Sequence, residues 1–455
     1  MNDAMAGMSP RRRFLAAWAL SIGSTIASIS VGSVNVALPT IAKDLGVAPS
    51  QAVFVVTIYQ TVLLMTVLPL SALGERVGPR NVYQWGQAIF VVASVAAFWA
   101  NSLALLVLLR GIQALGAAAI FSVSMVLLRA VYPNEKLGRG MAINTLVAAG
   151  SAAIAPTLGG FVISIASWPW IFMACVPVGL VSLLVSYLSL PDLERSTQPY
   201  DTVAAVLCAA MFGAAVFGLE GVVHGDSWPH IVLLLVAAVA IGTVFIRRER
   251  GKSTPILPVE LLGNRKIALP LISTFAVSMA SMLALLSLPF RLETGFGYTP
   301  GEAGLMLGAW TSATMVIGPL AGLMSDRVPS SIIGSLGMAI AAAGLVSLAF
   351  LPAEPEHFDL VWRLMLSAGG LGMFYAPNSR QIILAVPLTR AAAAGGLAQT
   401  MRMIGQVLGS SATAGMLAMG FAVGPAPALL ATVLVLISLV CCLALLGSQR
   451  RPPVS

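Results

Sequence analysis

The stretch Pro69-Leu-Ser-Ala-Leu-Gly-Glu75-Arg76-Val77 has a close counterpart much later in the chain, Pro319-Leu-Ala-Gly-Leu-Met-Ser-Asp326-Arg327-Val328. The two acid-Arg-Val triplets are separated by 251 residues. Each triplet directly follows a long apolar run and precedes another one. The chain therefore repeats the same junction between two apolar segments, once in each half.

Two further pairs of residues have nearly the same separation. Arg110 and Arg363 are 253 residues apart, and Arg139 and Arg390 are 251 residues apart. Each pair stands at the same place relative to the surrounding apolar runs. Three landmarks at one spacing indicate two homologous halves, an arrangement that recurs in helical membrane transporters.

The composition identifies the solvent of most of the surface. Of 455 residues, 58% are hydrophobic and only 9% are charged, whereas a soluble domain carries roughly 25% charged residues. Many apolar runs reach the roughly 20 residues that a helix needs to cross a bilayer. The runs are continuous rather than alternating, which excludes a membrane β-barrel. The sequence therefore predicts an all-α, multi-pass membrane protein with the lipid bilayer as its surroundings.

Fourteen apolar segments read as membrane-spanning helices, and the first reads as a span rather than a cleaved signal peptide. With alternate loops assigned to the inside, 20 of the 25 Lys and Arg residues fall there and only Lys43 and Arg291 fall outside. This bias is typical of cytoplasmic loops, and it places both termini in the cytoplasm. The predicted spans are 14–36, 51–73, 81–100, 103–129, 140–163, 168–190, 202–221, 229–246, 267–290, 303–324, 331–351, 359–379, 392–420 and 426–447.

The repeat and the spans together predict the domain organisation. Residues 1–191 form an N-terminal six-helix bundle, residues 192–252 hold two inserted transmembrane helices, and residues 253–455 form a C-terminal six-helix bundle. The net charge of +8 comes from short loops, so it predicts no nucleic-acid partner. The four cysteines lie inside apolar runs without metal-ligand spacing, so we expect no metal site and no bound cofactor.

Four motifs, in order, resemble those of the major facilitator superfamily, and within it the fourteen-span drug:proton antiporter group. They are Val34-Asn35-Val-Ala-Leu-Pro39 in the first span, Leu73-Gly-Glu75-Arg76-Val-Gly78-Pro-Arg80 in the following loop, Arg110-Gly-Ile-Gln113 in the fourth span, and Gly150 with Ala155-Pro156-Thr-Leu-Gly159-Gly160 in the fifth. The resemblance covers nearly the whole chain. It implies a fold of two six-helix bundles with two inserted helices.

The resemblance also implies roles for these residues. The loop acid would pair with a neighbouring helix end, giving a charge network that holds one conformation and releases in the other. We call this set the conformational latch: Glu75, Arg76, Gly78, Arg80, Asp326 and Arg327. The fifth-span motif, Gly150, Pro156, Gly159 and Gly160, resembles one that marks exporters, and its small residues favour a close, sealing contact between the halves.

Polar residues deep in spans form the predicted substrate and proton pathway. A charged side chain in hydrocarbon is costly and must face the interior or water, so Arg110 leads this set, with a role in proton relay or substrate contact implied by the family. The alternative is that carbonyls satisfy it, or that it reaches toward the outer surface. The full set is Ser30, Asn35, Tyr59, Gln60, Arg110, Gln113, Asn144 and Tyr375.

Ser30 departs from the antiporter pattern. The family usually carries an Asp there, and this sequence has no carboxylate at the centre of any span. Neutral or anionic substrates therefore fit the charge balance better than cations. A coupling proton would have to use Glu75 or an outer carboxylate such as Glu220 or Glu293.

The sequence thus predicts a bacterial inner-membrane exporter of small amphipathic molecules, monomeric and driven by the proton gradient through alternating access. One alternative is a transporter of one specific metabolite or anion, or an uncoupled facilitator, since Ser30 replaces the acid. A membrane receptor or scaffold without transport is another. An intramembrane enzyme is a further alternative, which the sequence does not favour, because such an enzyme needs a nucleophile-base pair or metal ligands at depth and all three histidines lie outside the central spans.

Overall fold

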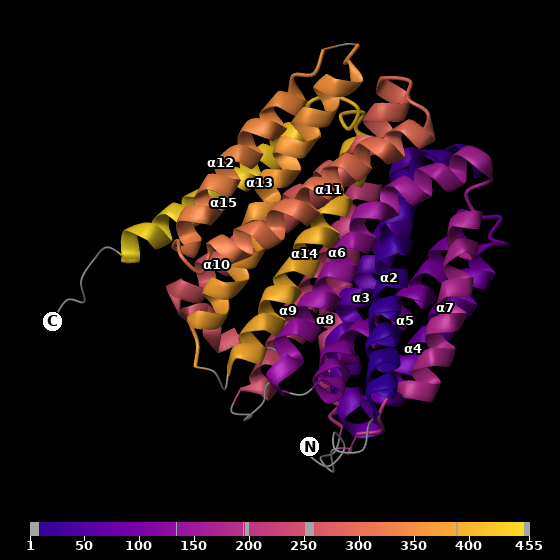
Figure 1. The fold of residues 1–455 in the computed structure, drawn as a ribbon. Helices are drawn as coiled ribbons and strands as arrows, with labels where there is room; N and C mark the ends of the chain where they lie inside the picture. The colour runs from indigo at the N-terminus through magenta and orange to yellow at the C-terminus, as the bar shows by residue number, and fades with distance from the viewer. Residues whose placement is uncertain are drawn as a thin grey trace. The chain divides into compact units, whose positions relative to one another are not determined.

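A computed structural model describes residues 9–132, 134–193, 195, 200–250, 259–352, 354–387 and 390–449. Within these ranges the chain forms fourteen α-helices and two short helices of other types, and no β-strand. Figure 1 traces them in chain order. The predicted all-α fold is confirmed.

Eight of the helices precede residue 250. They are α2 (Pro10–Asp44), α3 (Pro49–Val77), α4 (Pro79–Ala97), α5 (Leu103–Val131), α6 (Asn134–Ile165), α7 (Trp170–Ser189), α8 (Thr202–His224) and α9 (Trp228–Glu249).

The remaining elements follow residue 258. They are the 3-10 helix η1 (Val259–Gly263), α10 (Arg265–Phe290), the π-helix η2 (Arg291–Gly295), α11 (Pro300–Met324), α12 (Ser330–Ala349), α13 (His357–Leu384), α14 (Ala391–Ala418) and α15 (Ala426–Gln449).

The chain divides into two compact units. The first comprises Met1–Val47 and Phe54–Arg248, and the second comprises Ala48–Val53 and Glu249–Ser455. The first unit contains both α8 and α9. The prediction of two bundles separated by an inserted pair at 192–252 stays a prediction, and we keep it as a proposal.

Eleven helices in the described part of the chain are long and apolar enough to cross a membrane. The other three are α4, α13 and α14, which carry more polar side chains along their length. Several helices also run beyond the predicted spans: α2 extends from Pro10 to Asp44, although its apolar run covers only 14–36. The apolar length reflects the hydrocarbon thickness, whereas backbone hydrogen bonding continues into the polar flanks.

The same helix pairs pack in both units. In the first unit α2 packs on α6 and α7, and α4 packs on α5 and α7. In the second unit α10 packs on α14 and α15, and α12 packs on α13 and α15. Under the 251-residue repeat these pairs are equivalent, so the sequence repeat corresponds to a repeat of packing.

Local signals start and turn the helices. The Ser102 hydroxyl accepts from the Leu105 amide at the start of α5, and Thr299 with Glu302 forms a capping box at the start of α11. Such caps satisfy amides that have no partner inside the helix. Gly78, with φ of 102°, joins α3 to α4, a conformation that only glycine adopts without strain.

A buried polar network joins α2, α4 and α7. The Gln87 amide donates to Ser182 Oγ over 2.6 Å and accepts from Ser186 Oγ over 2.8 Å. The Tyr83 hydroxyl and Ser182 Oγ both donate to the carbonyl of Ala19, over 2.9 and 3.1 Å. These groups satisfy one another, and so they fix the relative positions of three helices.

Helices α2 and α7 are also joined at both ends. At one end Arg12 Nε donates to the carbonyl of Ser189 over 3.2 Å. At the other end the indole nitrogen of Trp168 donates to Asp44 Oδ2 over 2.6 Å. Because each bond links the start of one helix to the end of the other, the two helices are antiparallel neighbours.

Helices α8 and α9 form a hairpin beside α3. Arg248 near the end of α9 makes an ion pair of 3.2 Å with Asp201, the N-cap of α8. A side chain at Gly213 of α8 would meet Met65 of α3 at 2.8 Å. The close approach at Gly213 therefore seats this hairpin on α3.

Candidate functional site

Arg110 forms the centre of a polar cluster inside the first unit. It lies in the second turn of α5 and is fully buried, with 0% of its surface exposed. Its Nη1 donates to Gln113 Oε1 over 2.5 Å and to Ser30 Oγ over 3.0 Å. Its Nε donates to the carbonyl of Val55 over 3.4 Å. Helices α2, α3 and α5 therefore all contribute to its surroundings.

Aromatic rings complete the environment of this guanidinium. The ring of Tyr59 lies 4.2 Å from the guanidinium carbon, measured to the ring centroid, and the ring of Phe172 lies at 5.8 Å. The negative face of an aromatic ring attracts a cation, most strongly when water is excluded. The Arg110 charge is thus held by dipoles and π-faces.

No carboxylate contacts Arg110 among the residues that the structure describes. Its Nη2 is buried and has no hydrogen-bond partner, and neither has the hydroxyl of Tyr59 beside it. A buried charge without a counter-ion costs several kcal/mol, and its unused donors add to that cost. The cluster therefore holds unused hydrogen-bonding groups and a cation with no carboxylate beside it among the described residues.

Arg363, the repeat counterpart of Arg110, has a different environment. Its Nη2 makes an ion pair of 3.0 Å with Asp359, and its Nη1 donates to the carbonyls of Ser347 and Phe350. These partners satisfy the side chain locally, as expected for a structural arginine near a helix start. The two halves have therefore diverged: one keeps its cation paired, and the other keeps it unpaired.

Gln113 connects Arg110 to α4. While its oxygen accepts from Arg110, its Nε2 donates to Ser94 Oγ over 2.7 Å, and Ser94 in turn donates to the carbonyl of Phe90 over 2.7 Å. This chain fixes the orientation of the Gln113 amide. The sequence did not single out Ser94, because a lone serine in an apolar run carries no distinguishing pattern.

The other predicted pathway residues lie apart from these hydrogen bonds. Asn35 is buried in α2, and its Oδ1 has no partner. Gln60 is 9% exposed in α3, and Asn144 is half-buried in α6. Their assignment to the pathway stays a prediction.

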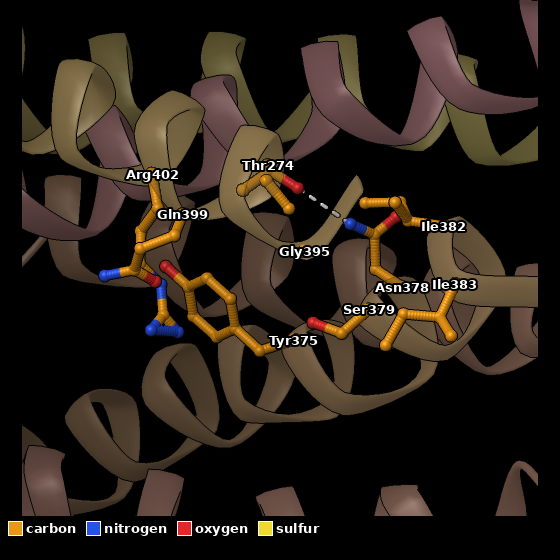
Figure 2. A pocket seen from close by; sticks show the side chains of 10 residues that line it. Thr274, Tyr375, Asn378, Ser379, Ile382, Ile383, Gly395, Gln399 and Arg402 are labelled. Carbon is orange, nitrogen blue, oxygen red and sulfur yellow. Dashed lines mark hydrogen bonds between the residues drawn. The ribbon is translucent and has the colours of Figure 1, made fainter. Parts of the chain in front are cut away.

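Tyr375 belongs to a second polar pocket, inside the second unit (Figure 2). Its ring lies 4.8 Å from the guanidinium carbon of Arg402, and its hydroxyl is 3.4 Å from Ser278 Oγ. Asn378 Nδ2 donates to Thr274 Oγ1 over 2.8 Å and to the carbonyl of Pro270 over 3.2 Å. The pocket has a volume of about 90 Å³.

The predicted latch shows an ion pair in the second unit. Asp326 Oδ1 lies 3.4 Å from Arg380 Nη2 on α13, and Arg380 also donates to the carbonyl of Ser325. Arg327 is exposed. Arg380 lies outside the predicted set, and the role of Asp326 in a latch stays a prediction.

In the first unit the equivalent contacts differ. Arg80 donates to the carbonyl of Tyr187 over 2.7 Å and lies over the ring of that residue. Glu75 and Arg76 are exposed, and neither makes an ion pair within the described ranges. The pairing of Glu75 stays a prediction.

The fifth-span motif with its glycines and Pro156, called the Gly-Pro motif from here on, lies in α6 and packs against α2 of the same unit. A side chain at Gly159 would stand 2.7 Å from the Cα of Ser33 and 2.8 Å from its carbonyl oxygen. Ser33 Oγ donates to the carbonyl of Ala155 over 2.9 Å, an acceptor one turn before Gly159 in the segment where Pro156 disturbs the helix ladder. Gly160 is buried and Gly150 half-buried. The close contact at Gly159 is thus internal to the unit, and the sealing contact between halves stays a prediction.

The structure brings Ser30, Tyr59, Arg110 and Gln113 together, and their role in a substrate or proton pathway stays a prediction. Two helical units with apolar, membrane-length helices, one of which holds a buried cation without a counter-ion among the described residues, are typical of a multi-pass membrane transport protein. The chain belongs to the Major Facilitator Superfamily, whose family model matches residues 20–270 and 270–455.

Curated relatives support this membership. The chain is 39% identical to an uncharacterized transporter, YebQ, of Escherichia coli (strain K12), over 90% of each protein. It is 30% identical to the multidrug resistance protein Stp of Mycobacterium tuberculosis (strain ATCC 25618 / H37Rv), over 90% of this chain and 76% of Stp. It is 26% identical to the riboflavin transporter RibZ of Clostridioides difficile (strain 630), over 86% of this chain and 85% of RibZ.

Proposed function

We propose that this protein exports small amphipathic molecules across the bacterial inner membrane by alternating access, driven by the proton gradient, with both termini in the cytoplasm. The observation that carries the proposal is Arg110, a fully buried guanidinium whose Nη2 has no hydrogen-bond partner. An ionisable residue inside a membrane helix is costly, and it is retained where it serves a substrate or ion pathway.

Two further findings support export rather than import. The Gly-Pro motif in α6 resembles the motif of exporters, and at Gly159 it packs directly on α2, which carries Ser30 of the Arg110 cluster. The resemblance to Stp, named as a multidrug resistance protein, agrees with that direction. A change in α2 packing would therefore reach Ser30 and Arg110 directly.

Glu293 is our candidate for the coupling proton. It lies in the π-helical turn η2 that continues α10, and its Oε1 is buried without a hydrogen-bond partner. Single π-turns occur frequently at functional sites. A carboxylate in such a place gains and loses a proton at little structural cost, as coupling requires.

The proposal is tested with purified protein in liposomes under an imposed pH gradient. Carboxyfluorescein serves as the anionic probe and ethidium as the cationic probe. We expect gradient-driven transport of at least one probe by the wild type, and its loss in Arg110→Ala. Arg129→Ala is the matched control, since Arg129 is an exposed residue at the end of the same helix. Absence of gradient-driven transport, or full activity of Arg110→Ala, would overturn the proposal.

The alternative is a transporter of one metabolite or anion, with or without proton coupling. Ser30, standing beside an unpaired Arg110, favours it, because no acid neutralises the cation within the described part of the chain. The resemblance to RibZ, named as a riboflavin transporter, also fits a single metabolite. A protonophore separates the cases: it abolishes accumulation against a gradient by an antiporter, but leaves a facilitator's downhill flux unchanged.

A further inference from the structure

The pocket of the second unit combines one cation with several neutral polar groups (Figure 2). It is lined by Thr274 of α10, by Tyr375, Asn378 and Ser379 of α13, and by Gln399 and Arg402 of α14. Two isoleucines of α13 form an apolar end. No Asp or Glu is among the described residues that line it, so the charge of Arg402 is not neutralised within the pocket.

Arg402 is oriented by an aromatic ring rather than by an acid. Its guanidinium carbon lies 4.8 Å from the centroid of Tyr375, and Figure 2 shows its side chain beside that ring. It makes no ion pair among the residues that the structure describes. A guanidinium held in this way keeps its planar set of donors available for a carboxylate or sulfonate.

The opposite wall of the pocket is fixed. Asn378 Nδ2 is engaged by Thr274 Oγ1 and by the carbonyl of Pro270, and Thr274 itself donates to that same carbonyl over 2.9 Å. Both side chains therefore form a rigid wall. Ser379 and Gln399 are exposed at the rim, so the pocket is open to a ligand from that side.

We propose that this pocket binds the anionic end of an amphipathic substrate, a carboxylate or sulfonate, with Arg402 as its counter-ion. The volume of about 90 Å³ is small beside the roughly 300–1,000 Å³ of pockets that enclose a whole drug-sized ligand. It therefore accommodates the charged group and its first atoms, and the rest of the molecule extends past Ser379 and Gln399.

Two other arginines belong to helices that line the pocket. Arg380 follows Ser379 near the end of α13, and Arg390 is the N-cap of α14. Each has its own acidic partner, Asp326 for Arg380 at 3.4 Å and Glu260 for Arg390 at 3.7 Å. Of these three arginines, Arg402 is the one that lines the pocket and has no acidic partner in the described ranges, which makes it the residue to test.

The inference names the substrate class of the exporter proposed above and rests on that proposal, but its test requires no transport. Ser379→Cys places a thiol at the rim, and the four native cysteines are all buried. The labelling rate is measured with two thiol reagents of opposite charge, the sulfonate MTSES and the trimethylammonium MTSET. We expect the ratio of the MTSES rate to the MTSET rate to be higher at the introduced thiol than at a free thiol in solution.

The charge of Arg402 is then varied in the Ser379→Cys background. In Arg402→Gln we expect the MTSES-to-MTSET rate ratio to fall about tenfold, since a nearby unscreened charge changes local ion concentrations by that order. Arg402→Lys keeps the charge and restores most of the ratio. Leu262→Cys is the control: this 39% exposed position in η1 lies outside the pocket, and its thiol should keep the same ratio whether or not Arg402 is replaced.

An unchanged ratio in Arg402→Gln, or a preference for MTSET at the rim thiol of Ser379→Cys, would overturn the inference even if the protein exports its substrates. Conversely, if the expected ratio is found but the protein transports no probe, the anion site is supported and the export proposal is overturned. A fall of the ratio in the Leu262→Cys control as well would show that the whole fold has changed, and would also count against a local role of Arg402.

Discussion

Arg110 Nη1 donates a hydrogen bond to Ser30 Oγ over 3.0 Å, so the residue that replaces the usual first-span acid lies in direct contact with the buried cation. Because Ser30 carries no charge, this contact leaves Arg110 without a counter-ion among the described residues.

Ser30→Asp should create a buried ion pair with Arg110, because a carboxylate at this position reaches the same Nη1. We expect a higher midpoint of thermal unfolding and a shift of transport from carboxyfluorescein toward ethidium, by about tenfold in the ratio of initial rates. Ser30→Asn, of similar size but neutral, is the control. Equal probe ratios in Ser30→Asp and Ser30→Asn would contradict this prediction.

Arg110→Met should abolish transport while leaving the fold at least as stable. The substitution removes a buried charge whose lack of a counter-ion costs several kcal/mol, which outweighs the roughly 1–3 kcal/mol for the Gln113 oxygen left without its donor. Arg110 has no acidic partner to leave behind among the described residues. Arg363→Met is the matched variant: it leaves Asp359 unpaired and should lower stability by about 1 kcal/mol while transport persists. Thermal unfolding and efflux, measured on both variants, check the contrast; a reversed order would refute it.

Gly159→Ala should destabilise the first unit by about 1–3 kcal/mol, because the added methyl group meets the backbone of Ser33 at 2.7 Å. Gly396→Ala is the control, since a methyl group there meets nothing within 4 Å. In a helix such a replacement stabilises by roughly 0.5–1 kcal/mol. The midpoint of thermal unfolding in detergent should therefore fall in Gly159→Ala and rise slightly in Gly396→Ala.

Asp326→Asn should leave stability almost unchanged but alter the transport rate. The side chains of Asp326 and Arg380 are 67% and 40% exposed, and exposed ion pairs contribute only about 0–1 kcal/mol. An effect on turnover well beyond that on unfolding would identify the pair as part of the conformational latch. If turnover and unfolding are both unchanged, Asp326 only fixes the loop.

The fold was predictable because two independent patterns agreed: apolar runs of membrane length and a repeat of 251 residues. The same patterns could not define helix ends. α2 continues through Pro39 to Asp44, beyond the predicted end at 36, because hydropathy measures contact with lipid and not backbone hydrogen bonding. The π-turn η2 likewise has no signal in hydropathy, since it changes the register of a helix and not its composition.

Part of the site was predictable from the free-energy cost of placing a charged side chain in hydrocarbon. Arg110 stands out because charge is rare in the spans, and Tyr59 and Gln113 followed as polar residues deep in spans. Ser30 was singled out because the resemblance implies an acid at its position. Arg363 held a local signal that was not used: Asp359 lies one helical turn before it, the spacing at which such ion pairs form. The contact between Tyr375 and Arg402 could not be foreseen, because it depends on how two separate helices are rotated.

Helices α2 and α7 are bonded at both extremities, Arg12 to Ser189 and Trp168 to Asp44. Hydrogen bonds near both ends oppose sliding of α2 along α7, so the two helices are expected to move together. Ser30 lies on α2, and Phe172, whose ring faces Arg110, lies on α7. A joint movement of α2 and α7 relative to α5 would therefore shift the Ser30 hydroxyl and the Phe172 ring together relative to the Arg110 guanidinium. Both contacts of Arg110 would then change at the same time.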